Sequence, residues 1–257
     1  MADKTLDYYD DPLFNYRQFW ATRQYEDQAE RSALKKLLVL IKSKKIKNLI
    51  DIGAGFGRLT PVYTPLFQSC LLVEPSEKLL AEAKKINRRY DNLSFKESYV
   101  EKLPVEDNSF DVALMVRVAH HLPDLEKMIT EVKRILKPEG YFIMEFANKM
   151  HFKNRLEALI KFNFIFFRSH LPENLKTKRN TAPFFNYHPN QIKTLFLSHD
   201  FQIIKSISVS NFRHSWLKKL MPLKFLLWLE NLRQGISLHQ NLYLGPSIFV
   251  LAKKENK

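Results

Sequence analysis

The sequence has a single cysteine, Cys70, among 257 residues. One thiol can form neither an internal disulfide nor a cysteine-based metal cluster, and scarcity of cysteine is typical of proteins of the reducing cytosol. We therefore expect no resident metal and a cytoplasmic location.

Long apolar runs are absent as well. A membrane-spanning helix needs about 18 or more apolar residues in succession, and the two most apolar stretches, 158–167 and 216–232, fall short of this. Charged residues interrupt both of them: Lys161, Lys218, Lys219, Lys224 and Glu230. Residues 1–12 carry four aspartates and no apolar run, so we expect neither a membrane span nor an export signal.

Acidic residues are scarce in the second part of the chain. Residues 148–257 hold 18 Lys and Arg against 5 Asp and Glu, whereas residues 1–147 hold 23 against 22. Nearly all of the net charge of +14 therefore lies beyond residue 147. A surface of this kind favours anionic partners, either membrane headgroups or nucleic acid, and a position peripheral to a membrane is one consequence.

Short apolar runs alternate with helical periodicity between Asn48 and Phe146, which is typical of βαβ units in a parallel sheet. The strands are predicted at 48–52, 70–74, 93–97, 110–116 and 141–146, with helices at 26–42 and between the last two strands. Beyond them we predict helices at 153–167 and 189–198, a strand at 201–208, a basic helical stretch at 216–233 interrupted at Pro222, and a strand at 246–252.

The predicted fold class is α/β: a doubly wound, mostly parallel, seven-stranded sheet of the Rossmann-like kind, with a helical insertion after strand 5. We expect one domain with two parts. Residues 1–147 supply the N-terminal helices and the ligand-binding α/β core. Residues 148–257 supply a basic insertion, which covers the acceptor side, and the last two strands.

Three of the six glycines fall in one short motif, Asp51-Ile52-Gly53-Ala54-Gly55-Phe56-Gly57, where the first strand ends and a helix should begin. Glycines let the chain turn tightly and let a ligand approach the backbone. A helix N-terminus also favours a negative group. The motif therefore predicts a ligand at the carboxyl edge of the sheet, although a tight turn without ligand produces the same pattern.

The second predicted strand ends at Glu74, whose carboxylate can accept hydrogen bonds from the two hydroxyls of a ribose. A nucleoside-type cofactor is the resulting hypothesis. Nicotinamide cofactors are disfavoured because their motif requires Gly or Ala at the sixth loop position, which is Arg58 here. Asp51 would also repel a pyrophosphate.

Taken together, these residues resemble the class I S-adenosylmethionine-dependent methyltransferases, near the ubiquinone and menaquinone methylases. The similarity runs from Asn48 to Phe146. Besides the glycine motif and Glu74 it includes Glu101-Lys102-Leu103-Pro104, Asp107-Asn108-Ser109-Phe110-Asp111, His120-His121-Leu122 and Leu136-Lys137-Pro138-Glu139-Gly140.

The resemblance implies S-adenosylmethionine as cofactor, with S-adenosylhomocysteine as product. The residues it assigns to the cofactor are Asp51, Gly53, Ala54, Gly55, Gly57, Glu74, Pro75, Tyr99, Val100, Glu101, Arg117 and Arg23. Arg23 would pair with the carboxylate of the methionine part, from an N-terminal segment that folds over the cofactor. Tyr99 stands where the family usually has an aspartate for the adenine amino group, so stacking or the Val100 amide would replace that contact.

Methyl transfer from a sulfonium is a displacement at an activated carbon, so alignment supplies much of the catalysis and a base is optional. For a hydroxyl acceptor, His121 is our candidate base, with His120 as the alternative. Both histidines can equally well serve only to pack or cap the turn.

The acceptor is predicted to be a small, hydrophobic or lipid-like molecule that undergoes O- or C-methylation. Phe162, Phe164, Phe166 and Phe167 form either its pocket or part of the core, and residues 216–233 form either an interfacial helix or a packed one. The competing hypotheses are an RNA methyltransferase that uses the basic part, a non-catalytic nucleoside-binding protein and an NAD-dependent oxidoreductase.

Overall fold

The computed structural model describes residues 9–11, 13–41, 46–175, 183–236 and 243–256. A seven-stranded sheet forms the centre, in the order β3-β2-β1-β4-β5-β9-β8. Its strands are β1 (Asn48–Ile52), β2 (Ser69–Val73), β3 (Leu93–Lys96), β4 (Phe110–Met115), β5 (Leu136–Ala147), β8 (Phe201–Val209) and β9 (Ser247–Lys254). β1 to β5 are parallel, and β9 runs antiparallel to both β5 and β8. The predicted mostly parallel seven-stranded sheet is confirmed.

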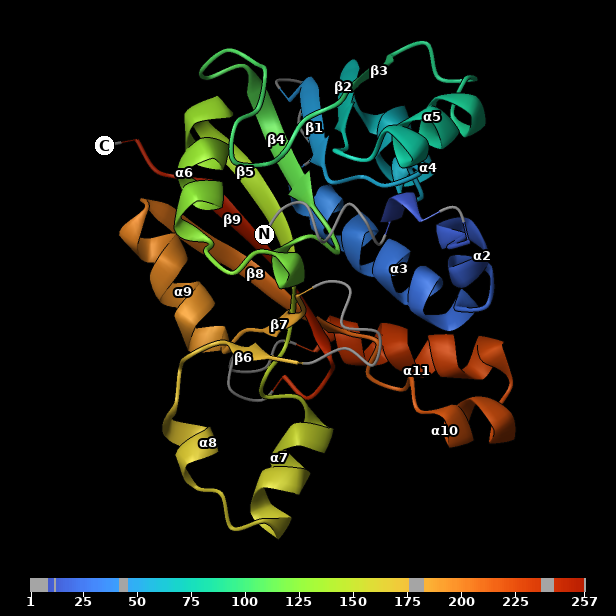
Figure 1. Cartoon of the computed structure of the whole chain (residues 1–257), viewed down its shortest axis with the longest axis vertical. Coiled ribbons are helices and arrows are strands. Elements are labelled where there is room, and N and C mark those ends of the chain that lie inside the picture. Colours follow the sequence, from blue (N-terminus) through green and yellow to red (C-terminus); the bar gives the residue numbers. More distant parts are fainter. Residues whose placement is uncertain (1–8, 12, 42–45, 176–182, 237–242, 257) are drawn as a thin grey trace.

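Helices cover both faces of the sheet (Figure 1). The larger ones are α3 (Gln24–Ile41), α5 (Glu77–Ile86), α6 (Glu126–Ile135), α9 (Pro189–Ser198) and α11 (Leu223–Gly235). The apolar side of α3 packs with alternate residues of the central strands in one core, which includes Leu34, Leu114 and Phe249. α6 and α9 pack in the core on the opposite face. Successive side chains of a strand point to opposite faces of the sheet, so the apolar residues of the central strands contribute to both cores.

Short elements connect these parts. They are α2 (Tyr16–Ala21), α4 (Thr60–Tyr63), η1 (Thr64–Leu66), η2 (Ala119–His121), α7 (Phe152–Ile160), α8 (Ile165–Arg168), β6 (Glu173–Asn174), β7 (Phe185–Asn186) and α10 (Ser215–Leu220). β6 and β7 form a separate antiparallel pair. The expected break at Pro222 lies between α10 and α11.

Residues 153–167 do not form the single helix that was predicted. α7 ends at Ile160 and α8 begins at Ile165, because Phe162 adopts a left-handed conformation with φ of 52°. The side chain of Asn163 then accepts a hydrogen bond from the Phe166 amide at 3.3 Å, in the manner of a helix cap. The chain therefore turns back on itself as a short helical hairpin.

The phenylalanines of this segment are neither in the core nor in a described cavity. Phe162 and Phe164 are exposed, while Phe166 and Phe167 are half-buried. Neither role expected of these rings, an acceptor pocket or a place in the core, is therefore found for them in the cavities and cores described. α11, in contrast, packs on α3 through Leu226 and Glu230 while its Trp228 stays exposed, so that helix is packed on one side and apolar on the other.

No helix in the described part of the chain is both long and apolar enough to cross a bilayer. The same residues contain no cluster of His, Cys, Asp or Glu side chains suited to a metal ion. Cys70 is buried in strand β2.

Candidate functional site

The glycine motif forms the bend directly after β1. Gly53, Gly55 and Gly57 all have positive φ, at 67°, 58° and 74°. This backbone conformation suits glycine because it has no Cβ to clash with the chain. The Gly53 and Ala54 amides donate to the Val73 carbonyl at 2.8 and 3.1 Å, which ties the bend to the end of β2.

Glu74 follows β2 and points at this bend. Its Oε2 accepts a hydrogen bond from the Gly55 amide at 2.7 Å, and its Oε1 accepts one from the Ser76 amide at 3.1 Å. A carboxylate has about four acceptor positions, so two positions are left for a ligand. Burial raises the pKa of Glu74 to about 7, although the two amides favour the ionised form.

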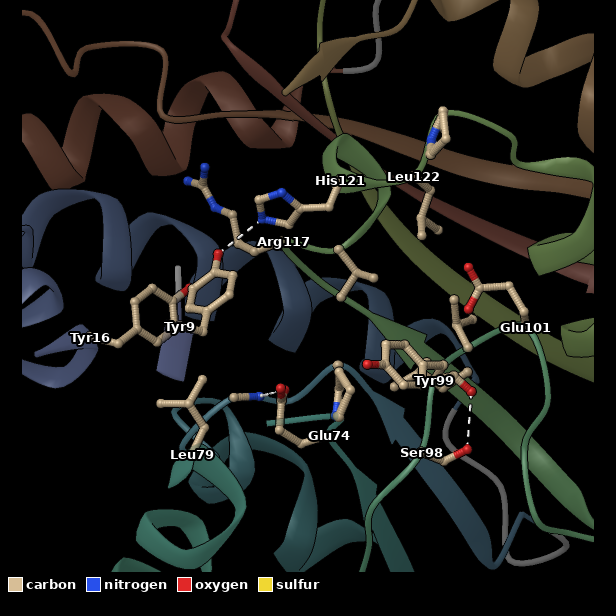
Figure 2. A pocket seen from close by; sticks show the side chains of 17 residues that line it. Tyr9, Tyr16, Glu74, Leu79, Ser98, Tyr99, Glu101, Arg117, His121 and Leu122 are labelled. Carbon is tan, nitrogen blue, oxygen red and sulfur yellow. Dashed lines mark hydrogen bonds between the residues drawn. The ribbon is translucent and has the colours of Figure 1, made fainter. Parts of the chain in front are cut away.

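A cavity of about 190 Å³ opens beside Glu74 (Figure 2). It lies at the carboxyl ends of the parallel strands, between the neighbours β1 and β4, where chain connections diverge to either side and doubly wound folds bind their ligands. The sequence-predicted residues that line it are Gly53, Gly55, Glu74, Pro75, Tyr99, Val100, Glu101, Arg117 and His121. The side chain of Tyr99 forms a wall opposite His121 in the view of Figure 2.

The remaining predicted residues lie elsewhere. Asp51 and Ala54 line a smaller recess of about 30 Å³ behind the bend. Gly57 faces Asn87, whose Nδ2 would lie 2.4 Å from an added Cβ, so this glycine allows the bend to pack closely on the end of α5. Arg23 stacks on the Phe19 ring at 4.1 Å and lines neither cavity.

Asp51 is buried at the end of β1, and its Oδ2 accepts a hydrogen bond from the Tyr63 hydroxyl at 2.9 Å. Burial raises the pKa of Asp51 to about 7. Two buried carboxyl groups thus lie next to the bend, Glu74 in the lining of the larger cavity and Asp51 in that of the smaller recess. Their negative charge would favour a cationic ligand and oppose a pyrophosphate.

A buried ion network supports the cavity from behind. Glu30 of α3 is completely buried and accepts hydrogen bonds from Arg117 through Oε1 and from Arg58 through Oε2, the latter at 2.5 Å. Arg58 also pairs with Asp27 at 2.5 Å and stacks on the Trp20 ring at 3.7 Å. The sixth position of the glycine motif therefore holds a structural ion pair.

Arg117 is held at two points. Its amide donates to Oε2 of Glu145 at 3.0 Å, and its guanidinium pairs with Glu30. Burial lowers the pKa of Arg117, but the carboxylate of Glu30 outweighs this effect and raises the pKa above its usual value. With φ of 65°, the residue adopts a conformation that is uncommon outside glycine. These contacts fix a charged wall of the cavity.

His121 presents a neutral imidazole to the cavity. Its Nδ1 lies 3.1 Å from the Pro183 carbonyl, which can only accept, so Nδ1 carries the proton. Nε2 therefore holds the lone pair, and the Tyr9 hydroxyl donates to it at 2.9 Å. Burial lowers the pKa of His121 to about 4, against the effect of the Pro183 carbonyl. His120 is buried against the Phe184 ring and does not line the cavity.

The N-terminal segment forms one side of the cavity through Tyr9 and Tyr16, as the expected segment over the cofactor would. Asp10 accepts a hydrogen bond from the Ser76 hydroxyl at 2.5 Å, and Lys78 donates to the Asp11 carbonyl at 2.7 Å. Tyr9 and Pro183 were not foreseen, because no spacing in the sequence connects them to residue 121. Glu30 had a signal: it is an acidic residue within the apolar stripe of a helix.

Comparisons with known proteins agree with this geometry. A family model described as "Methyltransferase domain" matches residues 50–144. The Bacillus subtilis methyltransferase YcgJ is 30% identical over 125 residues, covering 47% of this chain and 49% of that protein. The ubiquinone/menaquinone biosynthesis C-methyltransferase UbiE of Rickettsia bellii is 32% identical over 110 residues, covering 39% and 44%. The chain thus spans about half the length, or less, of these relatives.

Solved structures agree over a longer part of the chain. A S-adenosylmethionine-dependent methyltransferase from Thermotoga maritima superposes with a TM-score of 0.61 at 20% identity, covering 99% of this chain and all of that one. At this level of identity the likeness shows the fold alone. The likeness in fold therefore extends beyond residues 50–144, the part that the family model matches.

Proposed function

We propose that the protein is a S-adenosylmethionine-dependent methyltransferase that acts on a small, lipid-like acceptor. The match of residues 50–144 to a family model described as "Methyltransferase domain" supports this proposal. One observation carries the proposal. A single cavity brings together the Glu74 carboxylate, the open backbone of the glycine bend and the Tyr99 ring, with a neutral imidazole opposite.

The residues present fit this cofactor. Glu74 has acceptor positions left for the two ribose hydroxyls, and Tyr99 offers a ring for stacking on adenine. The carboxyl groups of Asp51 and Glu74 favour the positive charges of a sulfonium and an ammonium. When bound, S-adenosylmethionine would supply an activated methyl group, so that the protein has mainly to bind, align and exclude water.

The Tyr9 and His121 pair handles the proton of an acceptor hydroxyl. The imidazole is neutral at physiological pH, and the hydrogen bond between Nδ1 and the Pro183 carbonyl keeps its lone pair on Nε2, toward Tyr9. A hydroxyl placed against the Tyr9 oxygen can pass its proton to Tyr9 while Tyr9 passes its own to Nε2. A carbon acceptor would use the same route for the proton it loses.

A lipid-like acceptor is supported by the apolar lining near His121, where Leu122, Val118 and Pro123 contribute. UbiE, named for ubiquinone and menaquinone biosynthesis, points to the same class of substrate. With such an acceptor, the protein would bind its substrate at the surface of a membrane. An acceptor-library screen that reads S-adenosylhomocysteine release tests the activity, and titration with S-adenosylmethionine and NADH by calorimetry tests the cofactor. Binding of NADH alone would contradict the proposal.

The positive charge of residues 148–257 supports one other function, the methylation of RNA, because this part of the chain has 18 basic residues and only 5 acidic ones. Phosphate contacts make RNA binding strongly dependent on salt. Retention of RNA at low salt that disappears as salt rises would favour this alternative. Absence of retention at low salt would remove it.

We predict that Glu74→Ala weakens S-adenosylmethionine binding by about 1.5 to 3 kcal/mol, because a hydrogen-bonded carboxylate would be lost. The affinity should also depend on pH. The ribose hydroxyls need the ionised carboxylate, and since the pKa of Glu74 in the free protein is about 7, its ionised fraction falls as pH drops below that value. The dissociation constant should rise about tenfold between pH 8 and pH 6.

Calorimetry across this pH range checks the prediction, with Asp51→Asn as the matched variant because burial raises the pKa of Asp51 to about 7 as well. In Asp51→Asn, protonation of Glu74 should still raise the dissociation constant as the pH falls. In Glu74→Ala, this contribution to the pH dependence should be absent. Equal affinity and equal pH dependence in wild type and Glu74→Ala would refute the ribose contact.

We predict that His121→Ala lowers kcat by about 100-fold for a hydroxyl acceptor, as removal of a general base does. Tyr9→Phe should lower kcat in the same direction, and neither variant should change the affinity for S-adenosylmethionine more than threefold or so. Stopped assays of S-adenosylhomocysteine at saturating substrates measure this. A wild-type kcat in His121→Ala would contradict the role as general base and would mean that His121 only packs in the fold.

The pH profile of kcat provides a separate check on His121. A group whose pKa is lowered to about 4 stays neutral down to that pH, so kcat at saturating cofactor should remain level between pH 8 and pH 5.5. An ordinary imidazole, with a pKa of about 6.5, would be mostly protonated at the lower end of this range. A fall of kcat centred near pH 6.5 would contradict the assignment.

A further inference from the structure

The hairpin of α7 and α8 projects from one end of the molecule (Figure 1). It follows β5 and leads to the small sheet of β6 and β7. Lys149 anchors its base, because the Lys149 ammonium donates to the carbonyls of Ser169 and Leu171, both at 2.9 Å. The hairpin is thus attached at its base, and the rest of its surface is exposed to solvent.

The hairpin exposes many large apolar side chains. Ala158 is the only buried residue of α7, and α8 has none. Phe162 and Ile165 at the turn are 79% and 78% exposed. The exposed large hydrophobic residues of this segment are Phe152, Leu156, Leu159, Ile160, Phe162, Phe164, Ile165 and Leu171. Exposed apolar residues gathered on one element in this way mark a contact with a partner or a membrane.

Basic side chains accompany the apolar ones. Residues 152–171 contain Lys153, Arg155, Lys161 and Arg168, with Glu157 as the only acidic residue. Lys161 pairs with Glu157 at 2.6 Å, and the segment keeps a net positive charge. Bulky apolar residues combined with Lys and Arg are typical of elements that lie in a bilayer interface with anionic headgroups.

We propose that the α7–α8 hairpin docks the protein on the surface of an anionic lipid bilayer, with Phe162 and Ile165 entering the headgroup boundary. The exposed Lys153 and Arg168 then add positive charge that favours the negative headgroups. A second copy of the chain fits this surface less well, because two positively charged hairpins would meet and Lys is depleted at interface cores. RNA fits less well because the aliphatic residues Leu159, Ile160 and Ile165 neither stack on bases nor bind phosphate.

The hairpin is linked to the candidate active site through the chain. β7 directly follows Pro183 and Phe184, and the Pro183 carbonyl accepts the hydrogen bond from His121 while the Phe184 ring lies against His120. For a lipid-like acceptor, docking would place the protein at the surface that holds the acceptor. This reason for docking rests on the proposed function, whereas the docking itself does not.

Co-sedimentation with vesicles tests the proposal without cofactor or acceptor, so its failure is distinct from failure of the methyltransferase assignment. We expect the full chain to bind vesicles of equal parts phosphatidylcholine and phosphatidylglycerol, and to bind phosphatidylcholine alone much less. The double variant Phe162→Ser with Ile165→Ser should reduce partitioning at least tenfold or so, because two apolar side chains no longer leave water. The matched control is Val39→Ser with Leu40→Ser, which changes two exposed apolar residues of α3.

Tryptophan fluorescence distinguishes the hairpin from the other exposed apolar surface. The hairpin has no tryptophan, whereas Trp216 and Trp228 are exposed on α10 and α11. A Phe162→Trp variant, in a chain carrying Trp216→Phe and Trp228→Phe, should shift to the blue on vesicles and be quenched by brominated lipid.

Three results would overturn the proposal. They are absence of binding to the anionic vesicles, equal binding by the hairpin variant and the control, and quenching by brominated lipid of the wild-type chain, whose exposed tryptophans are Trp216 and Trp228, without quenching of the Phe162→Trp variant. A dimer in light scattering that the hairpin variant turns into a monomer would identify a second copy as the occupant instead.

Discussion

A Gly55→Val variant is expected to lose S-adenosylmethionine binding, with a dissociation constant raised at least about 100-fold, or ~2.7 kcal/mol. Gly55 has φ of 58°, which a β-branched residue adopts only at considerable cost. An added Cβ would begin 3.3 Å from Cε1 of Tyr16, at the wall of the cavity. The Gly55 amide also donates to Glu74, so a shifted backbone would displace the carboxylate that should hold the ribose.

The choice among the three glycines of the bend matters for this test. A Cβ at Gly53 would lie 2.3 Å from Cγ2 of Val118, and one at Gly57 would lie 2.4 Å from Nδ2 of Asn87. Substitutions there would disturb the packing of the fold itself. At Gly55 the neighbouring atom belongs to a tyrosine ring that borders the cavity, so the change acts mainly on the ligand.

Calorimetry measures the loss, and Gly235→Val is its matched control. Gly235 ends α11, and among the residues that the structure describes, apart from its chain neighbours and its own helix backbone, no atom lies within 4 Å of the position that its Cβ would take. The control should bind as the wild type does. Thermal unfolding should show a cooperative transition for both variants. Wild-type affinity in a folded Gly55→Val protein would mean that the cofactor does not lie over the bend.

The fold was largely predictable because its determinants are local in sequence. The apolar runs of β1, β2 and β4 and the glycines after β1 each act over a few residues, and the parallel order follows from the helices between them. The limit appeared at residues 153–167, where apolar residues recur at helical spacing across Phe162 and Asn163. Periodicity does not reveal that one residue takes a positive φ and that the next one caps a new helix.

The candidate site was predictable where one strand end supplies the residue, as with Glu74 and Gly55, and less so where distant segments meet. Tyr9, His121 and Pro183 come from three separate regions of the chain. Their contact depends on how the N-terminal segment and the residues before β7 close over η2. The structure places Arg23 away from the cavity, stacked on Phe19, a contact that the sequence did not indicate.

Glu30→Ala is expected to destabilise the fold by about 3 to 5 kcal/mol, because it leaves the buried guanidinium groups of Arg58 and Arg117 without their shared carboxylate. Both oxygens of Glu30 are engaged, its side chain is 0% exposed, and those of Arg58 and Arg117 are only 9% and 20% exposed. Asp27 can still pair with Arg58, so most of the lost stabilisation should come from Arg117.

Urea unfolding measures the change in free energy, and Glu157→Ala serves as control because its ion pair with Lys161 is exposed to solvent. The control should unfold as the wild type does, since exposed pairs contribute little. Glu30→Gln should fall between the two, because it keeps hydrogen-bond acceptance but not the charge. Since Arg117 lines the cavity, the Glu30 variants that remain folded should also bind S-adenosylmethionine less tightly. Equal stability of Glu30→Ala and Glu157→Ala would contradict the prediction. It would mean that Arg58 and Arg117 do not need the Glu30 carboxylate and that this ion network does not support the cavity.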